Sequence, residues 1–84
     1  MLYRIFTENK NHRQVEKIIN KYFSGFSILK SNGFWRLQRE KSLIIEIVTS
    51  DTDKLINDLA GEIKKLNKQE AILIQKINNN QWFI

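Results

Sequence analysis

The sequence contains few side chains that could carry chemistry. His12 is its only histidine and it has no cysteine, so neither a common zinc site nor a catalytic triad can be assembled. Asp51 and Asp53 could hold a hard cation, but the length and the glycine of a calcium-binding loop are missing. We expect His12 to lie on the surface and the two aspartates to cap a helix. The sequence predicts no metal site, no cofactor and no catalysis by side chains.

Glu46 is a carboxylate placed inside an apolar segment, residues 43–48. In such surroundings a carboxylate must be paired or have a raised pKa. We expect its partner to be Arg4 or Arg36 across a sheet, or a group at a subunit interface. No second carboxylate can be placed beside it, so the paired carboxylates of a glycosidase are not indicated.

Aromatic and cationic side chains are interleaved in the middle of the chain. Proteins that bind single-stranded nucleic acid on a sheet use rings to stack bases and cations to contact phosphates. In a strand, adjacent side chains such as Phe34 and Trp35 point to opposite sides, so only one can join a given surface. We predict that this cluster binds a partner or nucleic acid. Its members are Lys30, Phe34, Trp35, Arg36, Arg39 and Lys41.

Length and composition limit the class of protein. We expect the 84 residues to form one domain, residues 1–84, that buries about 60% of the surface of its unfolded chain. The net charge of +5 favours an anionic partner, although the excess of Ile, Lys and Asn also indicates an AT-rich genome. No apolar run reaches about 18 residues and no signal peptide is evident. We therefore expect a cytoplasmic protein without a membrane partner.

Apolar periodicity predicts the main elements. Residues 2–7, 26–29, 42–49 and 70–77 have the β-branched and aromatic content of strands. Residues 43–48 are apolar on both sides, which places that strand inside a sheet. Helical stripes begin after a capping box formed by Asn11 and Gln14, and again after residues 50–53. The stripes are Val15, Ile18, Ile19, Tyr22 and Phe23, then Leu55, Ile56, Leu59, Ala60, Ile63 and Leu66.

Each of the three glycines predicts a local feature. Gly25 should end the first helix in a left-handed conformation, and Gly61 should permit close packing of the second helix. Asn32-Gly33 is a strong hairpin signal that would pair residues 34–38 with residues 26–31. The alternative is a bulge at Gly33 within one long strand, with the turn at residues 39–41. We favour the bulge, because residues 42–49 need a neighbouring strand of similar length.

The element order β-α-β-β-α-β predicts an α+β protein with the ferredoxin-like fold, a four-stranded antiparallel sheet with two helices. Right-handed crossovers place both helices on one face, so the apolar opposite face needs another cover. We expect a homo-oligomer, either a dimer or a trimer. As an alternative, residues 82–84, which form a short extra C-terminal strand, or the long second strand folding over would cover this face within one chain. The predicted oligomer interface consists of Ile44, Glu46, Val48, Trp82 and Phe83.

Residues 26–77 also resemble known proteins. The segments at residues 33–36, 39–49 and 69–74 are similar to a small uncharacterised bacterial family of ferredoxin-like domains, and more remotely to the trimeric regulatory proteins of the PII and CutA type. The resemblance implies an oligomer that binds a ligand or a protein between subunits and catalyses nothing. Residues 66–69 lack the glycine-rich phosphate loop of the PII type, and its long regulatory loop shrinks to residues 36–41. ATP binding is therefore not implied.

Three hypotheses of function follow. The first is a non-catalytic, homo-oligomeric binding or regulatory module that contacts a protein partner through its basic aromatic hairpin. The second is a nucleic-acid-binding protein that uses Lys30, Arg36, Arg39 and Lys41. The third is an inhibitor encoded by a phage or plasmid that blocks a host complex by surface contact.

Overall fold

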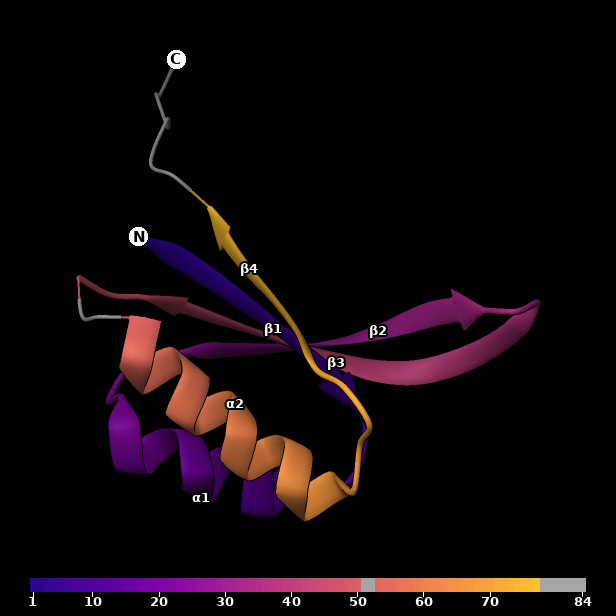
Figure 1. The fold of residues 1–84 in the computed structure, drawn as a ribbon, viewed down its shortest axis with the longest axis horizontal. Coiled ribbons are helices and arrows are strands. Elements are labelled where there is room, and N and C mark those ends of the chain that lie inside the picture. The colour runs from indigo at the N-terminus through magenta and orange to yellow at the C-terminus, as the bar shows by residue number, and fades with distance from the viewer. Residues whose placement is uncertain (51–52, 78–84) are drawn as a thin grey trace.

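The computed structural model describes residues 1–50 and 53–77. Over these ranges the chain forms four strands and two helices. They are β1 (Leu2–Glu8), α1 (His12–Tyr22), β2 (Ser27–Trp35), β3 (Gln38–Val48), α2 (Asp53–Asn67) and β4 (Leu73–Ile77). The strands pair antiparallel in the order β2-β3-β1-β4, and both helices cover one face (Figure 1). The predicted ferredoxin-like fold is confirmed, while the extra strand at residues 82–84 lies outside the described residues.

The core lies between the helices and the sheet face that they cover. Alternate residues of β1 and β3 point into it, and both helices contribute their predicted stripes. Burying a large apolar side chain contributes about 1.5–3 kcal/mol, so this layer supplies most of the stability. The buried apolar residues are Tyr3, Ile5, Val15, Ile19, Phe23, Leu43, Ile45, Ile47, Ile56, Leu59, Ala60 and Ile63.

The start of α1 differs from the prediction. Asn11 adopts a left-handed conformation with φ 52°, and its side chain makes no cap hydrogen bond. Its Nδ2 instead donates to Oδ1 of Asn67 at 3.0 Å, so a contact with the end of α2 replaces the capping box. The end of α1 also differs, because Phe23 leaves the helix in an extended conformation and Gly25 has no positive φ.

β2 and β3 form one long, regular hairpin. The pairing runs without interruption from Ser27 opposite Glu46 to Trp35 opposite Gln38, and Gly33 lies within it opposite Glu40. The prediction of one long strand beside β3 is confirmed. The predicted bulge at Gly33 and the alternative turn at Asn32-Gly33 are both wrong, because either would give up part of this uninterrupted ladder of backbone hydrogen bonds.

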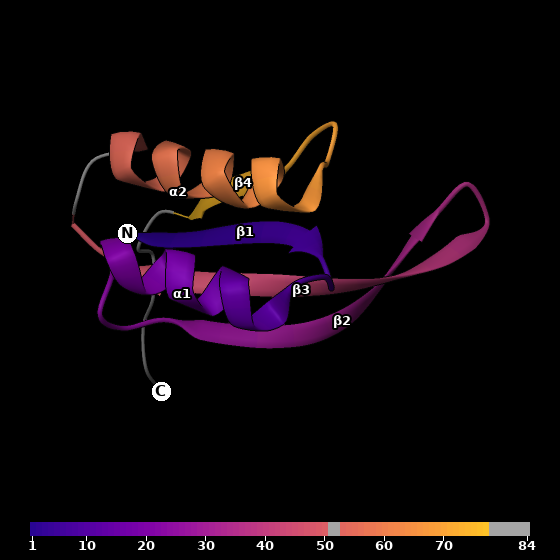
Figure 2. The ribbon, with the colours of Figure 1, turned by 90° about the horizontal axis from the view of Figure 1, so that it is seen from below.

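The hairpin turns at Arg36 and Leu37, and not at residues 39–41. Both residues have a left-handed backbone, with φ of 50° and 65°, as the favoured two-residue hairpin turn requires at its central positions. Figure 2 shows that the hairpin extends past the ends of both helices. We call residues 30–41, which include this extension, the arm.

Replacing Leu37 with glycine should raise the free energy of unfolding by about 1 kcal/mol, because a left-handed backbone costs a residue with a Cβ about 1–2 kcal/mol. The Leu37 side chain is fully exposed, so little packing is lost. Urea denaturation measures the change. The control Gln38→Gly, at the first residue of β3, should lower stability. A lower midpoint for Leu37→Gly would contradict the turn geometry.

Gly61 lies within α2, and a Cβ added there would meet no atom within 4 Å. Close helix packing is therefore not the reason for this glycine, contrary to the prediction. Gly61→Ala should raise the free energy of unfolding by about 1 kcal/mol through helix propensity alone. Thermal and urea denaturation measure it. Ala60→Gly, at the buried neighbouring position, should be destabilising, and a destabilising Gly61→Ala would show an unseen contact.

Candidate functional site

The arm brings four of the six predicted hairpin residues to one side. Strand alternation and the register place Lys30, Phe34, Arg39 and Lys41 on the side that continues the helix-covered face of the sheet. The other two residues lie at the end of the hairpin. Trp35 pairs with Gln38, and its side chain is outside what the structure describes, whereas Arg36 forms the turn.

Phe34 and Arg39 face each other across the two strands. The guanidinium carbon of Arg39 lies 5.8 Å from the centre of the Phe34 ring, which is within the range of a cation–π contact. The ring is 71% exposed, so most of its surface remains accessible. Arg39 therefore holds a ring in place while leaving it able to contact a ligand.

Lys30 and Lys41 lie nearer the sheet, at the base of the arm. With Asn9, Ser31 and Asn32 they line a cavity of about 260 Å³. The backbone N–H of Asn9 donates to the carbonyl oxygen of Lys41 at 3.1 Å, which ties the β1–α1 connection to the arm. Neither ammonium forms an ion pair with any residue in the described ranges. The two charges are thus available to an anion.

Leu37 is a candidate that sequence reasoning missed. It forms the turn with Arg36, and its side chain is completely exposed at the end of the arm. The sequence predicts the turn at residues 39–41 or at Asn32-Gly33, and neither alternative places Leu37 in it. An exposed leucine in a conformation that favours glycine is a surface feature available to a partner.

The sheet face turned away from the helices is here called the outer face. Away from the arm it carries three rows of side chains, and a fourth, polar row of Ser31, Ser42 and Glu8 lies toward the arm. Of the three, the two outer rows are apolar and the middle row is polar, because the register aligns like residues across the strands. The first row is Leu29, Ile44, Phe6 and Leu73, the second is Ser27, Glu46, Arg4 and Gln75, and the third is Val48, Leu2 and Ile77.

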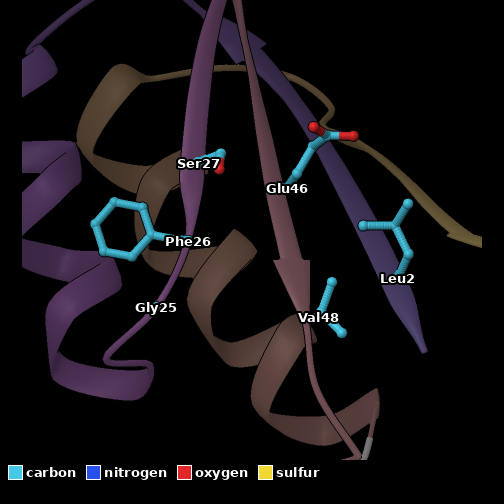
Figure 3. A pocket seen from close by; sticks show the side chains of 6 residues that line it. All are labelled: Leu2, Gly25, Phe26, Ser27, Glu46 and Val48. Atoms are coloured by element: carbon cyan, nitrogen blue, oxygen red, sulfur yellow. The ribbon is translucent and has the colours of Figure 1, made fainter.

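Glu46 lies at the centre of the outer face, where Nε of Arg4 donates to its Oε2 at 2.8 Å. The predicted pairing with Arg4 is confirmed, and the pair leaves the middle row without net charge. Next to it, Glu46, Leu2 and Val48 surround a hollow of about 460 Å³ (Figure 3), which Ser27, Phe26 and Gly25 also line.

Three of the five predicted interface residues can thus be placed. Ile44, Glu46 and Val48 all lie on the outer face, on β3. Trp82 and Phe83 lie outside the described residues. The common position of the first three follows from strand alternation, which the sequence already indicated.

A buried polar network was not predicted. Asn67 is 3% exposed, and its Nδ2 donates to Oγ1 of Thr7 at 3.2 Å and to Oε1 of Gln69 at 3.3 Å. The Thr7 hydroxyl donates to the same oxygen of Gln69, and Asn11 donates to Asn67. No buried side-chain polar atom in the described ranges lacks a partner. The network joins β1 to the start of α1 and the end of α2, next to the base of the arm.

The other titratable groups form structural contacts. Asp53 begins α2, where it accepts a hydrogen bond from the Tyr3 hydroxyl and forms an ion pair with Lys76 at 3.1 Å. The hydrogen bond from Tyr3 is the main cause that lowers the pKa of Asp53, and it raises the pKa of Tyr3. Asp51 lies outside the described residues. His12 is partly exposed, with Nε2 3.2 Å from Oε1 of Glu16.

A second cluster joins the helices. Glu62 of α2 accepts hydrogen bonds from the Lys21 ammonium, at 2.6 Å, and from the Tyr22 hydroxyl. The bond from Lys21 is the largest cause that lowers the pKa of Glu62.

Over residues 1–50 and 53–77, no three His, Cys, Asp or Glu side chains gather where they could hold a metal ion. No helix in this part of the chain is long and apolar enough to cross a membrane.

Solved structures with a similar fold include three that differ in origin. A DUF3240 family protein from Shewanella baltica has a TM-score of 0.67 and 18% identity, and the alignment covers 99% of this chain and 94% of that one. The de novo designed protein Foldit4 has a TM-score of 0.54 and 18% identity over 94% of each chain. A PII-like signaling protein from Thermus thermophilus has a TM-score of 0.44 and 16% identity, covering 88% of this chain and 78% of that one.

The likeness is one of fold. No family model matches the sequence, and no curated protein matches it. The resemblance inferred from residues 26–77 is confirmed as a likeness of fold by the DUF3240 family protein. Because a fold can host unrelated functions, the function has to be argued from the two surfaces described above.

Acid should destabilise the protein, and Asp53→Asn should remove part of that effect. The pKa values of Asp53 and Glu62 lie below their ordinary values of 3.8 and 4.5. Their stabilisation is therefore complete above those ordinary values and is lost as the pH falls through the lowered folded-state values. Urea midpoints measured in steps of about one pH unit between pH 7 and pH 2 test this. An Asp53→Asn curve parallel to that of the unchanged chain at every pH would contradict it.

Proposed function

We propose that this protein is a non-catalytic binding or regulatory module that works as a dimer, with the arm as its binding element. Two copies join through their outer faces, and each arm binds an anionic partner. A single histidine and the lack of cysteine support a function without catalysis. The row pattern on the outer face is the observation that carries the proposal.

The outer face exposes large apolar side chains. Leu29 is 45% exposed, Leu73 55% and Val48 76%. Complete burial of each would contribute about 1.5–3 kcal/mol, and contiguous exposed apolar surface commonly marks a site of interaction. The face has apolar side chains on both sides of a neutral polar row, so it favours an apolar partner surface with a few matching charges.

A second copy of the chain meets this requirement. A two-fold axis parallel to the strands, placed between β1 and β3, sets each apolar row against the same row of the other copy. Arg4 and Glu46 are cross-strand neighbours on β1 and β3, so the axis also sets Arg4 of one copy opposite Glu46 of the other. Opposite charges then attract across the interface as well as within each copy. The outer face is therefore complementary to itself.

The arm remains accessible in such a dimer. Its cationic side continues the helix-covered side of the sheet, which is turned away from the second copy. Both arms project from the same end of the dimer, because the axis is parallel to the strands. A partner with repeated negative charges could contact both arms at once and gain affinity from it.

Val48→Glu should convert the dimer to a monomer, because it places a charge in an apolar row of the interface. Light scattering should give about twice the chain mass of 10.0 kDa for the unchanged protein and the single mass for the variant. Asn57→Glu, which adds the same charge at an exposed position of α2, should remain dimeric. A monomer at high concentration before any substitution would refute the dimer.

Exchanging two charges tests the arrangement of the copies. Arg4→Glu alone sets two carboxylates against each other and should weaken dimerisation, whereas Arg4→Glu with Glu46→Arg restores both pairs and should recover it.

Deleting residues 78–84 tests the other occupant of the face. A monomer that associates only after this deletion would show that the C-terminal segment, and not a second copy, covers the outer face.

A further inference from the structure

We propose that the partner of the arm is single-stranded nucleic acid, held along the side that carries Lys30, Phe34, Arg39 and Lys41. This inference rests on the proposed role of the arm as the binding element and names its partner. The ring of Phe34 stacks on a base, and the three cations contact successive phosphates.

The register makes these residues a continuous track. Arg39 and Lys41 are two residues apart on β3, hence about 7 Å apart along the strand and on the same side. Phe34 lies directly opposite Arg39, and Lys41 lies opposite Asn32, two residues from Lys30 on β2. From the turn toward the sheet, the track thus offers the Phe34 ring beside Arg39, then Lys41 beside the amide of Asn32, and then Lys30. This alternation is how single strands are bound without sequence preference.

The charge on this side is uncompensated. None of positions 30, 32, 34, 39 and 41 is acidic, and Lys30, Arg39 and Lys41 form no ion pair with another described residue. Glu40 belongs to the opposite side of the arm by strand alternation. Glu40 and Glu8 both line a neighbouring cavity with Lys41, and Glu8 is already paired with Lys10 at 2.8 Å. An anion therefore meets cations without an opposing carboxylate on the track.

Two features favour a single strand over a duplex. A duplex keeps its bases stacked inside, so the exposed ring of Phe34 can reach a base only in an unpaired strand. The cavity beside Lys30 and Lys41 is about 260 Å³, below the usual range of about 300–1,000 Å³ for sites that enclose a drug-sized ligand. The cavity has room for a phosphate group of a nucleic-acid strand whose bases stay outside the cavity. An acidic peptide would use the cations but would give no role to the ring.

Fluorescence anisotropy with labelled twelve-nucleotide oligothymidylate and oligouridylate, and with a duplex of the same length, tests the inference. We expect both single strands to bind more tightly than the duplex. With three phosphate contacts, the logarithm of the binding constant should fall with the logarithm of salt concentration with a slope of about −2. Arg39→Ala and Lys41→Ala should each weaken binding severalfold and make the slope shallower by about 0.7.

Phe34 provides a readout that a purely electrostatic surface would not give. Phe34→Leu should weaken binding about tenfold with an unchanged salt slope, because base stacking is lost while the charges remain. Phe34→Tyr keeps a ring and should retain the affinity. Lys17→Ala removes the same charge as Lys41→Ala from an exposed position on α1 and should leave the slope unchanged. Thermal denaturation confirms that each variant is folded.

The outcomes separate this inference from the proposed function. No anisotropy change at low salt, while light scattering still reports a dimer, overturns the nucleic-acid partner and leaves the dimeric module standing. Equal affinity for duplex and single strand, with Phe34→Leu unchanged, shows only unspecific attraction of polyanions and also overturns it. Single-strand binding that persists in an Arg39→Ala and Lys41→Ala double variant overturns the role of the arm itself.

Discussion

The structure depends on β3 being paired along its whole length. Residues 42–48 of this strand pair with β1 and residues 38–46 pair with β2, so one uninterrupted strand passes from the core into the arm. Strand alternation then fixes the side of the sheet to which each side chain of β3 points. The register that buries Leu43, Ile45 and Ile47 also directs Arg39 and Lys41 to the helix side of the arm. It leaves Ile44, Glu46 and Val48 on the outer face.

This coupling gives the molecule two surfaces of different chemistry on opposite sides of one sheet. The outer face is apolar and its central ion pair is neutral, whereas the helix side of the arm is cationic. The proposed contact with a second copy on one side would leave the other side accessible. Because the arm extends past both helices (Figure 2), its cationic side avoids the cover that the helices give to the rest of that face.

The errors of prediction share a cause. Asn32-Gly33 favours a turn and Gly33 favours a bulge, but either would interrupt a ladder of nine paired positions. The chain therefore accepts a less favourable turn at Arg36 and Leu37. The capping box of Asn11 gives way to a hydrogen bond with Asn67, 56 positions along the chain. In both cases, contacts between distant segments outweigh local preferences that are worth about 1 kcal/mol.

Taken by itself, the sequence determined the element order, the two helical stripes, the strand faces and the ferredoxin-like fold, because apolar periodicity reports directly which side of each element is buried. It also indicated that Glu46 needs a cationic partner and that the outer face is apolar. Only the tertiary structure decided that Arg4 is that partner and that the arm turns at Arg36 and Leu37. It also decided that a polar network joins both helices to β1, through Thr7, Asn11, Asn67 and Gln69. These features depend on strand register and on distances between segments far apart in the chain, which local patterns do not encode.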